Sequence, residues 1–409
     1  MTLGQSLQYI AIYQSAEGDM MHLIPILSPL FLLLFSFHFL LIPCQASPVL
    51  LYTRQGPVRG LLFPSGNQAF FNLPYAIPPL GTLRFQPPLP APPLASTLDA
   101  TSRHVRCPQP KGGAVEGEED CLVLNLYTPY SPAPPGSPLP VMVYVHGGSF
   151  TSGSGAEDSV GPWLLVERGV ILIAVNYRLG VLGGLTTGTM EAPGNLGLRD
   201  ILLALTWVRE NVADFGGDPE RITLFGESAG SMAISALLAS PALEEGLVRR
   251  VILQSGTMVR NMEMARSSDN MAEYARTVGE GLGCGVEDLV ECLQAASVED
   301  LVGMTYLARP ARAWEPWVDA SLGEGAVLPR STLQVFRAGT NRRVEVIVGT
   351  NSGDGWLYGA DLFTDPEAWG QLALDWLGLA AGKLLGRIEP TLEVRWEVAG
   401  ANYQGPCSS

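Results

Sequence analysis

The sequence predicts an α/β protein whose mostly parallel central sheet is flanked by helices. Several short runs rich in Val and Ile lack polar alternation, as strands covered on both faces do. Helical patterns separate these runs, because Leu198, Ile201 and Leu205 recur at helix spacing. Alternating strands and helices are typical of a parallel sheet. The predicted strands are Val141–Val145, Val170–Val175, Ile222–Phe225, Val251–Leu253 and Val344–Val348.

Composition sets broad limits on the protein. Of the 409 residues, 47% are hydrophobic and 16% are charged, so the chain can bury a substantial core. The formal net charge is −15, which argues against nucleic acid and anionic membrane surfaces as partners. We predict no metal or organic cofactor, because no Cys/His cluster has metal-binding spacing.

The N-terminal region resembles a targeting segment. His22 to Pro43 carries no formal charge and is strongly apolar, and the small-residue site ending at Ala46 follows it. We predict a signal peptide cleaved near Ala46 and a secreted protein, with a signal anchor as the alternative. The predicted division is an extension and signal peptide at 1–46, one domain at 47–376, and a divergent tail at 377–409.

Secretion makes the six cysteines candidates for disulfides. Cys44 would leave with the signal peptide. The simplest pairing of the others forms two local bridges, Cys107–Cys121 and Cys284–Cys292, and leaves Cys407 unpaired.

Ser228 is the candidate nucleophile. The predicted strand Ile222–Phe225 runs directly into Gly226-Glu227-Ser228-Ala229-Gly230, and a helical pattern follows. A serine on such a strand–turn–helix is held in a strained conformation above the sheet edge, with helix N–H groups facing it. Read without this context, the motif is an ordinary Gly-rich turn.

A candidate oxyanion hole closes the strand Val141–Val145. His146, Gly147, Gly148 and Ser149 follow that strand, and the glycines leave backbone N–H groups sterically free to face a substrate carbonyl. Together with the N–H of Ala229 they would stabilise a tetrahedral oxyanion. The alternative is a simple turn at the end of a strand.

These motifs, with two more, resemble the type-B carboxylesterase/cholinesterase family of α/β-hydrolases. The likeness covers about residues 48 to 376. The matching segments are Leu73–Ala76 continuing to Phe85, Glu119–Tyr127, His146–Phe150, and Phe215–Pro219 leading into Gly226–Gly230.

The resemblance implies an α/β-hydrolase fold that acts on a small-molecule carboxylic ester through a Ser228 acyl-enzyme. It assigns the oxyanion hole to Gly147, Gly148, Ser149 and Ala229, although the family more often has Gly or Ala at the position of Ser149. It also implies the same two disulfides as the simplest pairing.

The resemblance places the acid member of the triad at Asp354, after the strand Val344–Val348. On composition alone, Asp354 is an Asp in a turn before Gly, which is a common placement.

The triad histidine has no candidate. In this fold the order along the chain is Ser, acid, His. The four histidines, His22, His38, His104 and His146, all precede Ser228. In the family, His146 opens the oxyanion loop and has a structural role. Relatives continue further, so we predict that the C-terminal part of the fold is missing and that the chain is a truncated or inactive form.

Three hypotheses follow. The first is a serine carboxylic-ester hydrolase represented by a truncated form. The second is a catalytically dead, secreted binding or adhesion module with a protein partner, which the missing histidine favours and the intact elbow opposes. The third is that this chain does not fold stably, because an incomplete sheet exposes apolar surface and an open edge.

Overall fold

The structure is a computed structural model of the 409-residue chain. It describes residues 46–102, 105–129, 137–156, 161–258, 268–307, 314–351 and 354. The predicted signal peptide (except Ala46), the predicted tail 377–409, and Cys44, His104 and Cys407 lie outside these residues.

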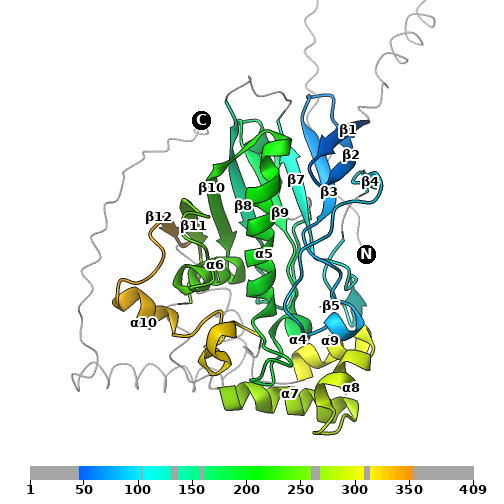
Figure 1. The fold of residues 1–409 in the computed structure, drawn as a ribbon, viewed down its shortest axis with the longest axis vertical. Helices are drawn as coiled ribbons and strands as arrows, with labels where there is room; N and C mark the ends of the chain where they lie inside the picture. The colour runs from blue at the N-terminus through cyan, green and yellow to red at the C-terminus, as the bar shows by residue number, and fades with distance from the viewer. Residues whose placement is uncertain are drawn as a thin grey trace, which may run out of the picture.

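A mixed sheet forms the centre of the molecule (Figure 1), with the strand order β1-β2-β3-β7-β9-β8-β10-β11-β12 and β4 paired to β2. From β9 to β12 neighbouring strands are parallel, whereas from β1 to β9 they are antiparallel. The strands are β1 (Ser47–Thr53), β2 (Gly56–Leu62), β3 (Gln68–Pro74), β4 (Leu98–Asp99), β7 (Val123–Thr128), β8 (Leu139–Val145), β9 (Ile171–Val175), β10 (Gly217–Glu227), β11 (Arg250–Gln254) and β12 (Glu345–Gly349). A separate hairpin joins β5 (Gln109–Lys111) to β6 (Ala114–Glu116).

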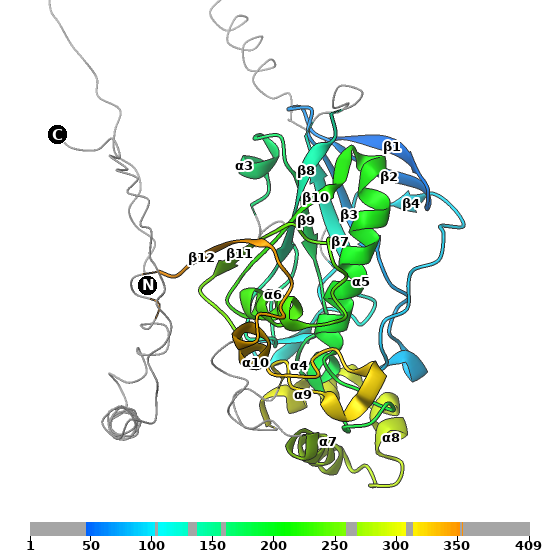
Figure 2. The same cartoon turned by 60° about the vertical axis from the view of Figure 1, so that its left-hand side comes forward.

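Helices cover both faces of this sheet. Figure 2 shows α5 and α6 on one face and α3 on the other, and α7, α8 and α9 lie below the sheet in both ribbon views. The helices are η1 (Gly81–Leu83), α3 (Trp163–Val166), α4 (Gly180–Gly184), α5 (Leu196–Asn211), η2 (Val212–Phe215), α6 (Ala229–Ala239), α7 (Ser268–Leu282), α8 (Leu289–Ala295), α9 (Val298–Leu307), η3 (Ala320–Gly325) and α10 (Thr332–Arg337).

The predicted α/β class is confirmed, and α5 shows why the pattern was informative. Leu198, Ile201 and Leu205 are all buried against the sheet, as their helical spacing predicted. The central strands β8 and β9 lie between this helix and α3, which explains their continuous apolar sequence.

The burial prediction for Val344–Val348 is wrong. The segment forms β12 from Glu345 to Gly349, but Val346, Ile347 and Val348 are 49%, 64% and 56% exposed. Among the described elements β12 pairs only with β11, so it is an edge strand. A run of apolar residues indicates a strand, but it does not indicate which other helices or strands pack against it.

A buried ion pair ties α5 to the segment that follows β9. The Arg178 guanidinium contacts Asp200 with a shortest N–O distance of 2.7 Å, and the two side chains are 4% and 0% exposed. The backbone N–H of Arg178 also donates to Asp200, and Arg178 Nη1 donates to Gln86 O. These bonds compensate both charges for their loss of water.

A second ion pair links the two disulfide-closed regions. Arg84 contacts Glu119 at 2.5 Å, and Glu119 precedes Cys121 by two residues. Arg84 Nη1 also donates to Leu293 O, Gln294 O and Ala296 O at the end of α8, which carries Cys292. The guanidinium therefore satisfies carbonyl groups that the helix itself leaves free.

None of the described helices has both the length and the apolar character needed to cross a lipid bilayer.

We expect Asp200→Asn to lower the free energy of unfolding by about 3 kcal/mol, because it leaves the buried Arg178 charge uncompensated. Urea unfolding measures this loss. The matched control is Asp218→Asn, which breaks the more exposed pair with Arg221 and should cost less than about 1 kcal/mol. Equal losses in the two variants would contradict the role assigned to the buried pair.

Candidate active site

The turn that carries Ser228 is packed tightly against the end of β8. Ser228 has φ 52° and ψ −121°, a strained backbone conformation between β10 and α6. A Cβ on Gly226 would lie 2.6 Å from Val145 O, and a Cβ on Gly230 would overlap the same oxygen. Both glycines are therefore required by contact with a neighbouring strand, in addition to the turn itself.

Neighbouring backbone holds Ser228 from its other side. Its N–H donates to Gln254 O at 2.9 Å, and Gln254 is the last residue of β11. Its carbonyl accepts from Met232 N at 2.9 Å in the first turn of α6. Ser228 is therefore held by β11 and by the first turn of α6, while the glycines of its turn pack against β8.

The loop after β8 lies beside this serine. A Cβ built on Gly147 would stand 3.1 Å from Ser228 Cβ and 2.9 Å from Glu227 Oε2. Ser149, with φ 56°, has an exposed side chain. Within the described chain, the backbone N–H groups of Gly147, Gly148, Ser149 and Ala229 donate to no protein acceptor. The structure thus brings the four predicted donors to the same end of the sheet as Ser228.

Asp354 reaches this end as well, because β10, β11 and β12 are adjacent in the sheet. Its carboxylate accepts from the backbone N–H and the side-chain amide of Asn351, each at 3.2 Å. The Ser255 hydroxyl, followed by these Asn351 donors, lowers the pKa of Asp354 from its usual value, so the carboxyl group is ionised at neutral pH.

Glu227 is a site residue that the sequence analysis missed. It precedes the nucleophile, and its carboxyl group borders Gly147. Partial burial, and then the charge of Asp354, raise the pKa of Glu227. The charge of Asp354 therefore disfavours ionisation of Glu227.

Ser255 was also missed. It follows β11, and its φ of 51° is unusual for a residue other than glycine. The sequence signal was a short polar residue directly after a buried strand.

His146 is structural in this arrangement. It is 4% exposed, its Nδ1 donates to Gly147 O at 2.8 Å, and its ring stacks on Tyr177 with centroids 4.3 Å apart. Burial, and secondarily the charge of Arg106, lower the pKa of His146 to about 4 despite the opposing bond to Gly147 O. The imidazole is therefore neutral at pH 7.

The disulfide-closed segment 107–121 and the neighbouring Arg106 hold the returning arm of the candidate oxyanion loop after β8. The Gln109 side chain is 5% exposed and forms paired bonds with Gly153, one from Nε2 to Gly153 O and one from Gly153 N to Oε1, both 2.8 Å. Arg106 donates to Ser154 Oγ at 2.8 Å. The structure contains both disulfides, Cys107–Cys121 and Cys284–Cys292.

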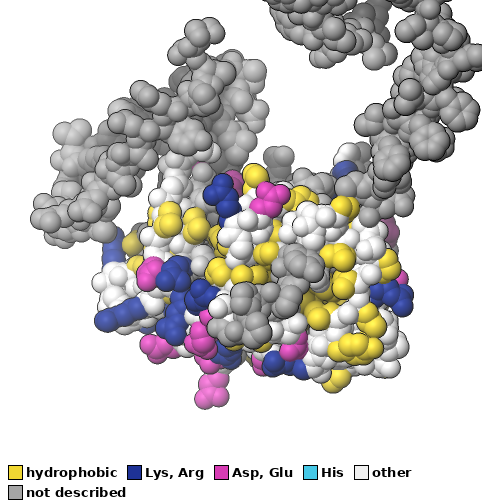
Figure 3. Space-filling view, turned by 90° about the horizontal axis from the view of Figure 1, so that it is seen from above, with side chains coloured by type: hydrophobic (Ala, Val, Ile, Leu, Met, Phe, Trp, Pro, Cys, Tyr) yellow, Lys and Arg dark blue, Asp and Glu magenta, His cyan; other side chains and the backbone are white. Residues whose placement is uncertain are grey.

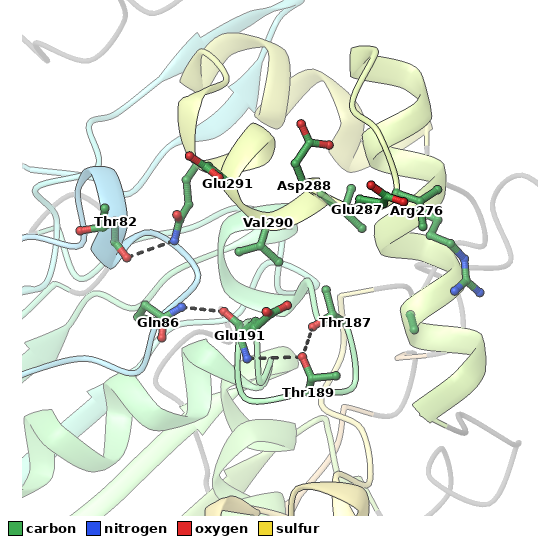
Figure 4. A pocket seen from close by; sticks show the side chains of 14 residues that line it. Thr82, Gln86, Thr187, Thr189, Glu191, Arg276, Glu287, Asp288, Val290 and Glu291 are labelled. Atoms are coloured by element: carbon green, nitrogen blue, oxygen red, sulfur yellow. Dashed lines mark hydrogen bonds between the residues drawn. The ribbon is translucent and has the colours of Figure 1, made fainter.

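A cavity of about 580 Å³ lies at a different place, between η1, residues 187–191 and helices α7 and α8. Figure 4 shows Glu287 and Arg276 among the polar side chains around it. Its lining includes neither Ser228 nor Asp354, so this cavity is separate from the candidate active site. No group of described residues has a composition suited to holding a metal ion.

Comparisons with known proteins identify relatives of this chain. The model of a family described as "Carboxylesterase family" matches residues 47–376. The chain is 36% identical to the cocaine esterase of Homo sapiens over 334 residues, which are 76% of this chain and 57% of the relative. It is 35% identical to the juvenile hormone esterase of Tribolium castaneum over 344 residues, with shares of 78% and 57%.

A third relative is the acetylcholinesterase of Electrophorus electricus, 33% identical over 365 residues, with 83% of this chain and 57% of the relative covered. The chain thus spans 57% of the length of each of these relatives.

We expect His146 to make stability fall with acidification. The unfolded chain binds a proton at pH values below about 6.5, whereas the folded chain does so only near pH 4, so unfolding is favoured as pH falls through this window. The full effect is roughly 3 kcal/mol. Urea unfolding of the parent and His146→Gln at pH 7 and near pH 4 should show the smaller pH dependence in the variant. Identical pH dependence would contradict a buried neutral His146.

We expect Gln109→Ala to loosen the oxyanion loop, because it leaves the N–H and C=O groups of Gly153 without partners at a cost of about 1–3 kcal/mol. Hydrogen–deuterium exchange of the peptide covering residues 147–153 should become faster by tenfold or more. Gln294→Ala is the control, since Gln294 bonds Thr82 O and Arg84 O instead. Similar exchange in the two variants would rule out the specific role of Gln109.

Proposed function

The chain belongs to the carboxylesterase family, and from this premise we propose that it carries the acyl-transfer site of a serine carboxylic-ester hydrolase, with Ser228 as nucleophile. The observation that carries the proposal is the strained Ser228 on its turn, with the loop of Gly147 directly beside it. A hydroxyl fixed in this way can attack an ester carbonyl without first having to be ordered.

The proposed mechanism assigns each group one task. Ser228 Oγ attacks the carbonyl carbon, forms an acyl-enzyme and releases the alcohol, and water then hydrolyses the acyl group. The N–H groups of Gly147, Gly148, Ser149 and Ala229 bind the oxyanion, and each such donor is worth about 3 kcal/mol. Asp354, ionised by its hydrogen bonds, is proposed as the acid member of the triad.

The Ser228 hydroxyl proton needs an acceptor, and in this fold that acceptor is a histidine that follows the acid residue in the chain. No histidine follows Ser228 within the 409 residues, and His146 is buried and bonded to Gly147 O. We therefore propose that these residues alone transfer acyl groups slowly, since loss of one triad member costs roughly 10⁴-fold or more in turnover. The second candidate function is a secreted binding module without catalysis, and the labelling experiment below separates the two.

The substrate is proposed only as a small-molecule carboxylic ester. The names of the three relatives refer to cocaine, juvenile hormone and acetylcholine, so they do not point to one common acyl or alcohol group. We therefore propose only that the residues around Ser228 bind the ester carbonyl group. Secretion is proposed on the apolar N-terminal segment, and the two disulfides agree with maturation in an oxidising compartment.

Reaction with a fluorophosphonate probe tests the nucleophile. We expect slow covalent labelling of the 409-residue chain that Ser228→Ala abolishes and the exposed control Ser65→Ala preserves. Added imidazole should accelerate labelling several-fold near pH 7, because it supplies the missing base from solution.

The outcomes separate the two functions. Labelling that persists in Ser228→Ala would refute Ser228 as the nucleophile. A folded chain that shows no labelling even with imidazole would reject the esterase proposal in favour of the binding module. Intact-protein mass spectrometry measures both.

A further inference from the structure

Arginine side chains gather at the amino-terminal ends of β11 and β12 and beside α10. The group consists of Arg249, Arg250, Arg330, Arg337, Arg342 and Arg343, here called the arginine surface. Figure 3, which views the molecule from above, shows several dark blue side chains on the left, with magenta acidic side chains among them, on the side that holds β11, β12 and α10 in Figure 1.

The backbone brings these residues together. Arg250 pairs with Glu345 in the parallel ladder, and Glu345 N donates to Arg249 O at 3.1 Å. Arg343 lies two residues before Glu345, so it is near the start of the neighbouring strand. Strands in a sheet lie about 4.8 Å apart, so the backbone of the pair Arg249-Arg250 is close to that of the pair Arg342-Arg343.

The residues beside α10 join the same surface. Arg330 Nη2 donates to Thr340 Oγ1 at 3.1 Å. Thr340 precedes Arg342 by two residues in the sequence, so the Arg330 guanidinium lies beside the segment that carries Arg342. The backbone N–H of Arg342 donates to Leu238 O at 2.9 Å and anchors this segment to the end of α6. Arg337 is exposed in the last turn of α10.

Carboxylates neutralise only part of this charge. Arg249 contacts Glu220 at 3.3 Å and Arg250 contacts Glu345 at 2.7 Å, and all four side chains are about half or more exposed. Such pairs are weak in water and exchange readily with other anions. Arg343 is exposed and forms no ion pair or hydrogen bond within the described part of the chain.

The arginine surface contrasts with the net charge of −15. That total is an average over the whole molecule, whereas a bound ligand responds to charges within a Debye length of about 8 Å at physiological ionic strength. The arginine surface also lies at the strand ends opposite the candidate active site, so catalysis does not account for it.

We propose that the arginine surface binds a sulfated polysaccharide of the heparin class. The planar guanidinium group can donate two parallel hydrogen bonds to a carboxylate and is weakly hydrated. It therefore suits a polymer whose anionic groups are closely spaced. A flexible chain of repeated anions can adjust its path to arginines that are spread over the starts of two strands and the segment beside α10. A rigid duplex would extend over the acidic remainder of the surface and be repelled.

Chromatography of the full chain on immobilised heparin at about 50 mM salt tests this proposal. We expect retention despite the sequence pI of about 4.7. The triple variant Arg249→Gln/Arg330→Gln/Arg343→Gln should elute much earlier. Its slope of log K against log salt should be smaller by about 2, since each lost contact removes roughly 0.7.

The matched control is Arg59→Gln/Arg168→Gln/Arg276→Gln, which changes the net charge equally at exposed sites on other elements. It should bind as the parent does, and both triples should keep the parent melting temperature. Three results would overturn the proposal: a parent chain that is not retained, a control triple that loses as much affinity, or a duplex DNA of equal charge that binds as tightly as heparin.

Discussion

The close approach between the turn after β10 and the end of β8 is the constraint on which the candidate site depends. Gly230 and Gly226 pack against Val145 O so closely that neither position has room for a side chain. Within this contact Ser228 adopts its strained conformation, and Gly147 lies beside it. The proposed nucleophile and the proposed oxyanion loop are thus positioned by a single packing contact between adjacent parallel strands, and large shifts of one strand would disturb both.

Charge at the site follows from the same sheet order. Glu227 ends β10, while Ser255 and Asp354 follow the adjacent strands β11 and β12, so the three residues meet at one edge of the sheet. Hydrogen bonds from Ser255 and Asn351 favour the charged form of Asp354 and lower its pKa, while partial burial and the Asp354 charge favour the neutral form of Glu227 and raise its pKa. Two carboxyl groups at one edge are therefore driven apart in acidity by their surroundings.

The remaining charged residues differ in their effect according to whether they are buried or exposed. Buried pairs such as Arg178 with Asp200 fix the packing between elements and are shielded from salt. The exposed Arg249 and Arg250 at the start of β11 are held by weak pairs that solvent and ions can replace. The net charge of −15 adds positive and negative residues from all parts of the molecule, so it does not give the local charge around either set of arginines.

The sequence by itself determined the features that depend on neighbouring residues: the strand runs, the helical spacing of α5, and the strand–turn–helix around Ser228. Tertiary structure alone decided which strands have neighbours on both sides. The sequence pattern therefore predicted a buried β12, whereas β12 is an exposed edge strand among the described elements. It also decided the partners of Gln109, Glu227 and Ser255. These contacts join residues far apart in the chain, and a local pattern reports backbone preference but not which distant groups the fold brings within hydrogen-bonding or Coulomb range.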